Sequence, residues 1–154
     1  MRTITEWLNE YGESHKNETN KLIHWICVPA ILFSILGMLY AVKLPLFIGA
    51  YQLNIGIVVS VAVLLYYFSL SVSLSVGMFL YLLVCMLLAN LIESSRIMPL
   101  WLFSIIIFAL AWVGQFYGHK IEGKKPSFLK DIQFLMIGPA WLMSFIYKKL
   151  GVGL

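Results

Sequence analysis

Long runs of residues without charge are the feature that most limits how this 154-residue chain can fold. A helix needs about 20 mostly apolar residues to span the hydrocarbon core of a bilayer, and only helices or closed barrels satisfy their backbone groups there. Four such runs predict membrane helices at about 22–42, 46–68, 74–92 and 99–117, with a short turn at 69–77. We therefore expect an all-α polytopic membrane helical bundle that residues 1–154 form as a single integral-membrane domain.

A fifth apolar segment, residues 132–147, is shorter and has Gly138-Pro139 in its middle. At about 16 residues it is short for a spanning helix, so it predicts a re-entrant segment, an interfacial helix or a fifth membrane helix.

The overall composition agrees with this class. Hydrophobic residues make up 61% of the chain and charged residues 12%, whereas soluble domains have roughly 45–50% and about 25%. This composition excludes an ordinary soluble domain and a disordered chain. The net charge of +4 does not indicate nucleic-acid binding, because membrane proteins collect Lys and Arg on their cytoplasmic side.

The distribution of the basic residues predicts the topology. With four spans, the N-terminal segment and the 119–130 loop lie on one face of the membrane. That face carries seven of the eleven basic residues, namely Arg2, Lys16, Lys21, Lys120, Lys124, Lys125 and Lys130, and the opposite face carries Lys43 and Arg96. The positive-inside rule then places the N-terminus and this loop in the cytoplasm, beneath a bacterial inner membrane or, in a eukaryote, the endoplasmic reticulum.

All three histidines fall on this same face. Asn17 is a typical helix N-cap, so the first long helix is expected to begin at Glu18 and leave His15 free to turn back toward it. Asn20 and His24 are four residues apart, on one face of that helix. Three imidazoles at one depth predict a metal site, since imidazole suits Fe, Zn, Cu and Ni.

The other end of the chain has a matching pattern. Gln115 and His119 are also four residues apart, and Glu122 follows on the same face if the helix continues through Gly118. Another interpretation remains open at this point. The histidines can lie at the lipid headgroups, with His119, beside Lys120, contacting lipid phosphate and the lysines serving as a topology signal.

These residues carry a resemblance to a known family. The segment His15-Lys-Asn17-Glu-Thr-Asn20-Lys-Leu-Ile-His24, followed by Val28-Pro29, resembles the H-x-N-P-x-N-x-x-x-H opening of the Mpo1-like family. Gln115-Phe-Tyr-Gly118-His119, with Glu122 and Pro126 after it, resembles that family's Q-F-x-G-H…E…P motif, and Gly138-Pro139 resembles its late A/G-P. The chain departs from the pattern at Glu18, where the family often has Pro, and at Lys16, where a second histidine can stand. The loop between His119 and Pro126 is also one residue shorter.

The resemblance implies a membrane-embedded Fe(II)-dependent dioxygenase that shortens 2-hydroxy fatty acids by one carbon, with O₂ as the second substrate. It implies that His15, His24 and His119 hold the iron. Asn20, Gln115 and Glu122 are then candidates for orienting imidazole N–H groups or binding iron-bound water, and Glu122 is alternatively a fourth ligand.

Two other functions remain to be weighed. A non-catalytic membrane protein that binds lipid or another subunit would place its histidines at the interface for that purpose. A small transporter would favour ionisable groups at mid-membrane depth, whereas here Glu93 and the histidines lie near the span ends.

Overall fold

The protein consists of six helices and one β-hairpin in the part of the chain that the computed structural model describes, residues 2–125 and 133–154. The elements are α1 (Ile4–Gly12), α2 (Glu18–Tyr40), β1 (Lys43–Ile48), β2 (Tyr51–Asn54), α3 (Ile55–Leu70), α4 (Val72–Ser95), α5 (Leu100–Glu122) and α6 (Phe134–Leu150). The fold is therefore helical apart from the hairpin. Three helices, α2, α4 and α5, are long and apolar enough to cross a membrane, and α3 is shorter.

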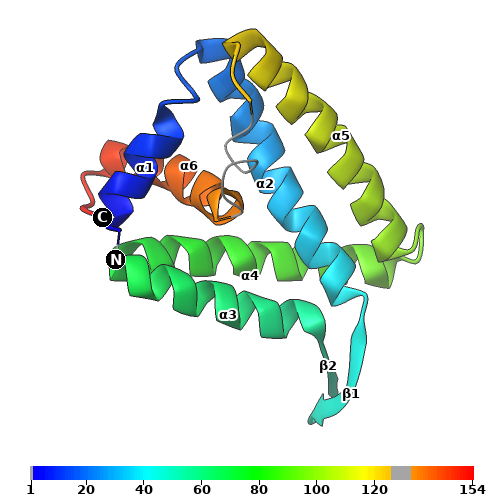
Figure 1. The fold of residues 1–154 in the computed structure, drawn as a ribbon. Helices are drawn as coiled ribbons and strands as arrows, with labels where there is room; N and C mark the ends of the chain where they lie inside the picture. The colour runs from blue at the N-terminus through cyan, green and yellow to red at the C-terminus, as the bar shows by residue number, and fades with distance from the viewer. Residues whose placement is uncertain (1, 126–132) are drawn as a thin grey trace.

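Helix α2, near the N-terminus, and helix α5, in the C-terminal half of the chain, pack against each other (Figure 1). They approach closely because small residues lie between them, as is common in membrane helix pairs. A Cβ added at Gly114 would lie 2.6 Å from Cys27 Sγ, one added at Gly118 would collide with Asn20 Oδ1, and one added at Gly37 would collide with the Ser104 side chain. Gly114 and Gly118, four residues apart, thus bring α5 against the start of α2.

Gly118→Ala is expected to lower the free energy of unfolding by about 1–3 kcal/mol, the usual cost of overpacking a tight contact. The added methyl group displaces the Asn20 side chain or separates the two helices. Thermal unfolding in detergent measures the effect, with Gly153→Ala as control because nothing lies within 4 Å of a Cβ at Gly153. Equal unfolding temperatures for the two variants would contradict this description of the helix pair.

Helices α3 and α4 form a second pair, which crosses the lower end of α2 in Figure 1, and α6 packs against α4 and α1. Buried tyrosines tie these layers together. Tyr67 Oη donates to the Met136 carbonyl at 2.6 Å, Tyr147 Oη to the Ser73 carbonyl at 2.6 Å, and Tyr81 Oη to the Pro29 carbonyl at 2.7 Å. The main core lies where α1, α2, α3, α4 and α6 meet.

The predicted span at 46–68 is wrong at its start. Residues 43–54 form an antiparallel hairpin, and the helix begins only at Ile55. The physical reasons are local: Pro45 cannot continue a helix, Gly49 has a φ of +60° at the turn, and Asn54 caps α3 by accepting from Ile57 N at 3.0 Å. The predicted count of four spans and one shorter segment is accordingly not confirmed.

Other boundaries also differ. Residues 69–77 are not a turn, because α3 ends at Leu70 and Ser71 caps α4 directly, its Oγ accepting from Leu74 N at 3.1 Å. Helix α5 continues past residue 117 to Glu122 and ends at Gly123, whose φ is +72°. The last segment is one helix, α6, rather than a re-entrant hairpin, and Pro139 lies inside it.

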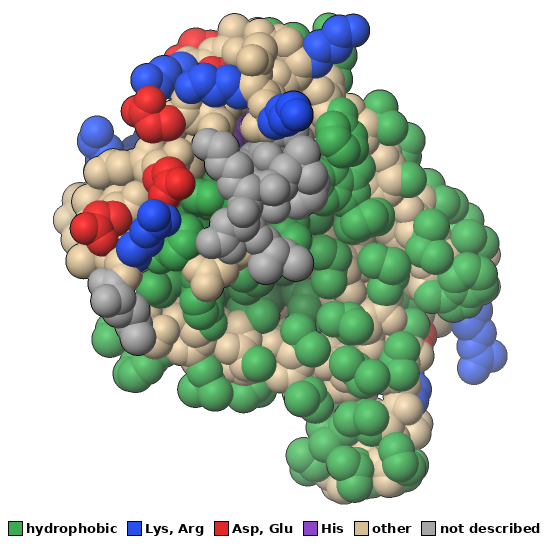
Figure 2. Space-filling view, in the orientation of Figure 1, with side chains coloured by type: hydrophobic (Ala, Val, Ile, Leu, Met, Phe, Trp, Pro, Cys, Tyr) green, Lys and Arg blue, Asp and Glu red, His purple; other side chains and the backbone are tan. Residues whose placement is uncertain are grey.

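Charged and apolar side chains separate on the surface. Figure 2 shows charged groups gathered at the upper left, over α1 and the region where α2 begins, and hydrophobic side chains over the lower and right parts. Many large apolar side chains on α3, α4 and α5 are exposed, among them Leu65 at 65% and Leu110 at 64%. Exposed apolar surface of this extent is typical of helices that face lipid.

The two segments that were expected to share one membrane face do lie together. Glu122 accepts hydrogen bonds from the backbone N–H groups of Lys16 and Asn17, and Lys124 Nζ donates to the Glu13 carbonyl. The part of the 119–130 loop from residue 126 onward is outside the described residues, so Pro126 and Lys130 have no structural account.

Candidate metal centre

A short helix that the sequence analysis missed positions the first histidine. Helix α1 begins with a capping box, in which Thr3 and Glu6 bond to each other's backbone N–H groups at 3.3 and 2.8 Å. Its apolar side packs on α6, with the Trp7 and Phe134 rings 5.4 Å apart. Spacings of three and four residues between Ile4, Trp7, Leu8 and Tyr11, together with the Thr3-x-x-Glu6 pattern, were the available signals for this helix.

His15 lies in the loop between α1 and α2 and turns back as expected. Asn17 caps α2, its Oδ1 accepting from Thr19 N at 2.9 Å and Asn20 N at 3.2 Å, which confirms the predicted helix start. The Tyr11 ring stacks on the His15 ring, with centroids 4.1 Å apart and planes 13° from parallel. Trp141 approaches the same imidazole at 5.3 Å.

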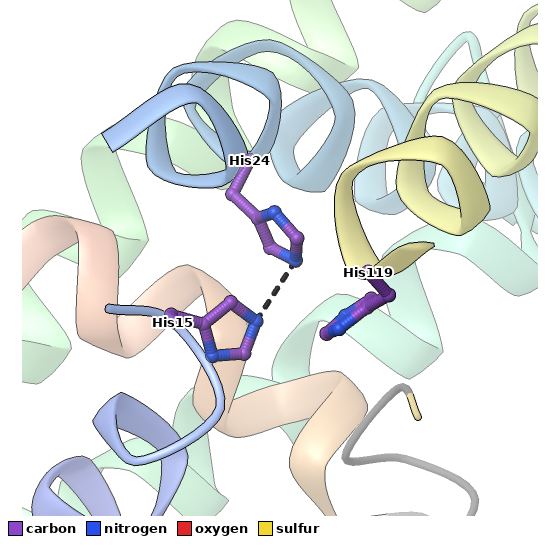
Figure 3. Close-up of side chains that lie close together, drawn as sticks. All are labelled: His15, His24 and His119. Atoms are coloured by element: carbon purple, nitrogen blue, oxygen red, sulfur yellow. Dashed lines mark hydrogen bonds between the residues drawn. The ribbon is translucent and has the colours of Figure 1, made fainter. Parts of the chain in front are cut away.

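The three histidines converge on one point. Figure 3 shows His15 entering from its loop, His24 from α2 and His119 from α5, with the rings directed toward one another. One nitrogen from each ring lies within 4.8 Å of the others, and all three residues are at most 4% exposed. His15 Nε2 and His24 Nε2 are 2.9 Å apart.

The hydrogen bonds to the other ring nitrogens determine which atoms can hold a metal. His15 Nδ1 lies 2.7 Å from the Tyr11 carbonyl oxygen, and His24 Nδ1 lies 2.9 Å from the Asn20 carbonyl oxygen. Carbonyls only accept, so both Nδ1 atoms carry the proton and a neutral ring directs its Nε2 lone pair inward. Burial lowers the pKa of His15, which favours this neutral form.

These observations fit a metal ion well. Two Nε2 lone pairs 2.9 Å apart repel each other unless a cation or a proton lies between them. His119 Nδ1 is buried and has no hydrogen-bond partner among the described residues. A set of three imidazoles, two of them oriented by backbone carbonyls, is a typical arrangement for a transition metal that keeps open coordination positions.

Glu122 acts on the loop that carries His15. Its carboxylate accepts from the backbone N–H groups of Lys16 and Asn17, each at 2.9 Å, and from Asn20 Nδ2 at 3.0 Å. No hydrogen bond links it to an imidazole nitrogen in the described part of the chain. Glu122 therefore connects the end of α5 to the start of α2, and both of its oxygens are already engaged.

Asn20 contributes to the site in two ways. Its backbone carbonyl accepts a hydrogen bond from His24 Nδ1. Its side-chain Nδ2 donates to the Glu122 carboxylate at 3.0 Å and to the Ser14 carbonyl at 3.5 Å. Asn20 Oδ1 is buried without a partner among the described residues. The Asn20 side chain thus lies next to the histidines without bonding to their rings.

Gln115 lies one turn before His119 on α5 and is 7% exposed. It lines a cavity beside His119 and makes no hydrogen bond with another residue that the structure describes. Of the three polar residues expected around the histidines, Gln115 is thus the one with a free amide beside a cavity.

Comparison with known proteins identifies the family of this chain. Residues 1–150 match the family described as 2-hydroxy-palmitic acid dioxygenase Mpo1-like. The chain is 34% identical over 146 residues to the 2-hydroxy-palmitic acid dioxygenase MPO1 of Saccharomyces cerevisiae, covering 94% of this chain and 79% of the yeast protein. No solved structure matches. The chain therefore belongs to the Mpo1-like family.

Proposed function

We propose that this protein is a membrane-embedded, Fe(II)-dependent dioxygenase that converts 2-hydroxy fatty acids to fatty acids one carbon shorter. His15, His24 and His119 would hold the iron at the membrane face where the N-terminus lies, which the charge distribution assigns to the cytoplasm. The convergence of three buried imidazoles from both ends of the chain is the observation that carries the proposal. The name of the yeast relative gives the class of substrate.

The reaction balances with O₂ as the only oxidant. When a 2-hydroxy acid becomes the acid one carbon shorter and the carboxyl carbon leaves as CO₂, four electrons pass to O₂ and one water forms. Bound iron would supply an open site for the substrate's carboxylate and hydroxyl together with O₂. Three protein ligands leave room for all of these.

The protein's own residues would bind and orient the reactants. Gln115, which lines the cavity together with His119, would hydrogen-bond the carboxylate or hydroxyl of a substrate. Tyr11 and Trp141 cover the His15 ring and exclude water from that side. Glu122 and Asn20 would keep His15 and His24 in place rather than contact the substrate.

Activity is tested with purified protein loaded anaerobically with Fe(II) and then given 2-hydroxypalmitic acid and O₂. We expect pentadecanoic acid and CO₂ in equal amounts, and no product after chelation of the metal. Tyr117→Phe should leave the rate unchanged, because Tyr117 lies on α5 close to His119 but is 60% exposed.

A protein that binds the hydroxy acid tightly yet forms no shorter acid under these conditions would contradict the proposal. That result would favour the non-catalytic lipid-binding protein instead.

A further inference from the structure

A narrow apolar cavity begins at the histidine site and extends into the part of the molecule formed by α2, α3, α5 and α6. Its volume is about 160 Å³, and its lining is almost entirely hydrophobic. On α2 the lining runs from Val28 to Leu36, eight residues or about 12 Å along the helix axis. Leu36 lies at the end of this stretch farther along α2 from His24, and Val59 and Val63 of α3 also line the cavity.

Polar groups occur at one end of this cavity only. His119 and Gln115 are both in its wall, and the Gln115 amide has no hydrogen-bond partner within the described residues. An amide in an otherwise apolar wall can donate to and accept from the polar end of a ligand. The cavity thus has a polar head at the proposed metal site and an apolar body, which matches a molecule with one polar end and one apolar tail.

The cavity also has a route from the surroundings. Ile35 and Trp112 in its wall are half-buried rather than buried, and they lie on α2 and α5. An apolar tail can therefore enter from the side, between helices that expose apolar surface elsewhere. Its small volume suits one chain and not the two tails of an intact membrane lipid.

We propose that this cavity binds the single acyl chain of a fatty acid with its carboxyl end at Gln115 and His119, and that Leu36 and Val63 set the longest chain accepted. The inference rests on the proposed function for the position of the head group. The binding of the tail needs neither iron nor turnover, so the two can be tested separately.

The test uses metal-free protein in detergent and parinaric acid, a fluorescent fatty acid excited by energy transfer from tryptophan, because Trp112 lines the cavity. Saturated fatty acids of increasing length then displace the probe. Affinity should rise roughly fourfold per added methylene, as expected for burial of apolar surface, until the tail has filled the cavity. Beyond that chain length it should stop rising.

Two substitutions should move this limit in opposite directions. Val63→Phe fills part of the cavity and should shift the limit to shorter chains, whereas Leu36→Ala enlarges the cavity and should shift it to longer ones. The matched control is Val61→Phe, the same change two residues away on α3, at a side chain that is 53% exposed and outside this cavity. Fe(II) binding should be the same in all of these proteins.

An unchanged limit in both Val63→Phe and Leu36→Ala, or an equal shift in Val61→Phe, would overturn the inference. If Val63→Phe does not fold, Leu36→Ala alone decides. A shifted limit in a protein without dioxygenase activity would uphold the cavity and reject the proposed reaction. Normal dioxygenase activity with an unchanged chain-length limit would support the proposed reaction and reject the proposed role of the cavity.

Discussion

His119→Ala is expected to abolish stable iron binding and with it the oxidation of 2-hydroxy fatty acids. His119 would be the ligand that α5 contributes, and without it only His15 and His24 of the three-histidine group remain. Loss of a residue that merely supports a ligand lowers metal affinity by about 10–100-fold, so loss of the ligand itself should exceed that range. Competition with a chelator of known affinity for Fe(II) measures the change.

Rescue by free imidazole distinguishes loss of the metal ligand from loss of the folded structure. The Ala variant leaves a space with the shape of the missing ring, so added imidazole should restore part of the iron binding and activity. Tyr117→Phe, on the same helix, should bind iron as the wild type does. If His119→Ala retained wild-type iron affinity, His119 would be removed from the ligand set.

Glu122→Gln is expected to lower the iron affinity by about 10–100-fold, the usual effect of altering a group that supports a metal ligand. The Glu122 carboxylate accepts from the N–H groups of Lys16 and Asn17, and an amide NH₂ would face one of these donors instead. The loop that carries His15 would then lose its attachment to α5. The measurement is Fe(II) affinity together with turnover at several iron concentrations.

Glu122 acts through the position of His15, so saturating Fe(II) should restore most of the turnover of Glu122→Gln but not that of His119→Ala. Glu18→Gln is the matched control, because Glu18 is close in sequence to the same loop and pairs with Lys21, with 86% of its side chain exposed. If turnover of Glu122→Gln stayed low at saturating iron, Glu122 would belong among the residues that contact iron or substrate.

Much of the candidate site was predictable because its determinants are local. The Asn17 cap and the shared helix face of Asn20 and His24 follow from helix geometry, and the structure confirms both. The sequence placed the end of the fourth span near residue 117, whereas α5 continues to Glu122. The role of Glu122 was not predictable. Its partners at Lys16 and Asn17 are more than 100 residues away and come together only when α2 and α5 pack.

The errors in the fold have a common origin. The hairpin at 43–54 contains Leu44, Leu46, Phe47 and Ile48, so its hydropathy resembles that of a spanning helix. The turn at Gly49 and the cap at Asn54 were weaker signals than this apolar composition. Helix α1 was missed because nine residues with a mixed composition contribute little to a search for long apolar runs.

The central claim is that His15, His24 and His119 together hold one iron ion. X-ray absorption spectroscopy of the wild-type protein, loaded anaerobically with one equivalent of Fe(II), tests this claim most directly. We predict a spectrum with three imidazole nitrogen ligands and oxygen ligands in the remaining positions, and a change in the oxygen shell when 2-hydroxypalmitic acid is added. Iron that does not stay bound, or a spectrum without imidazole scattering, would contradict the account.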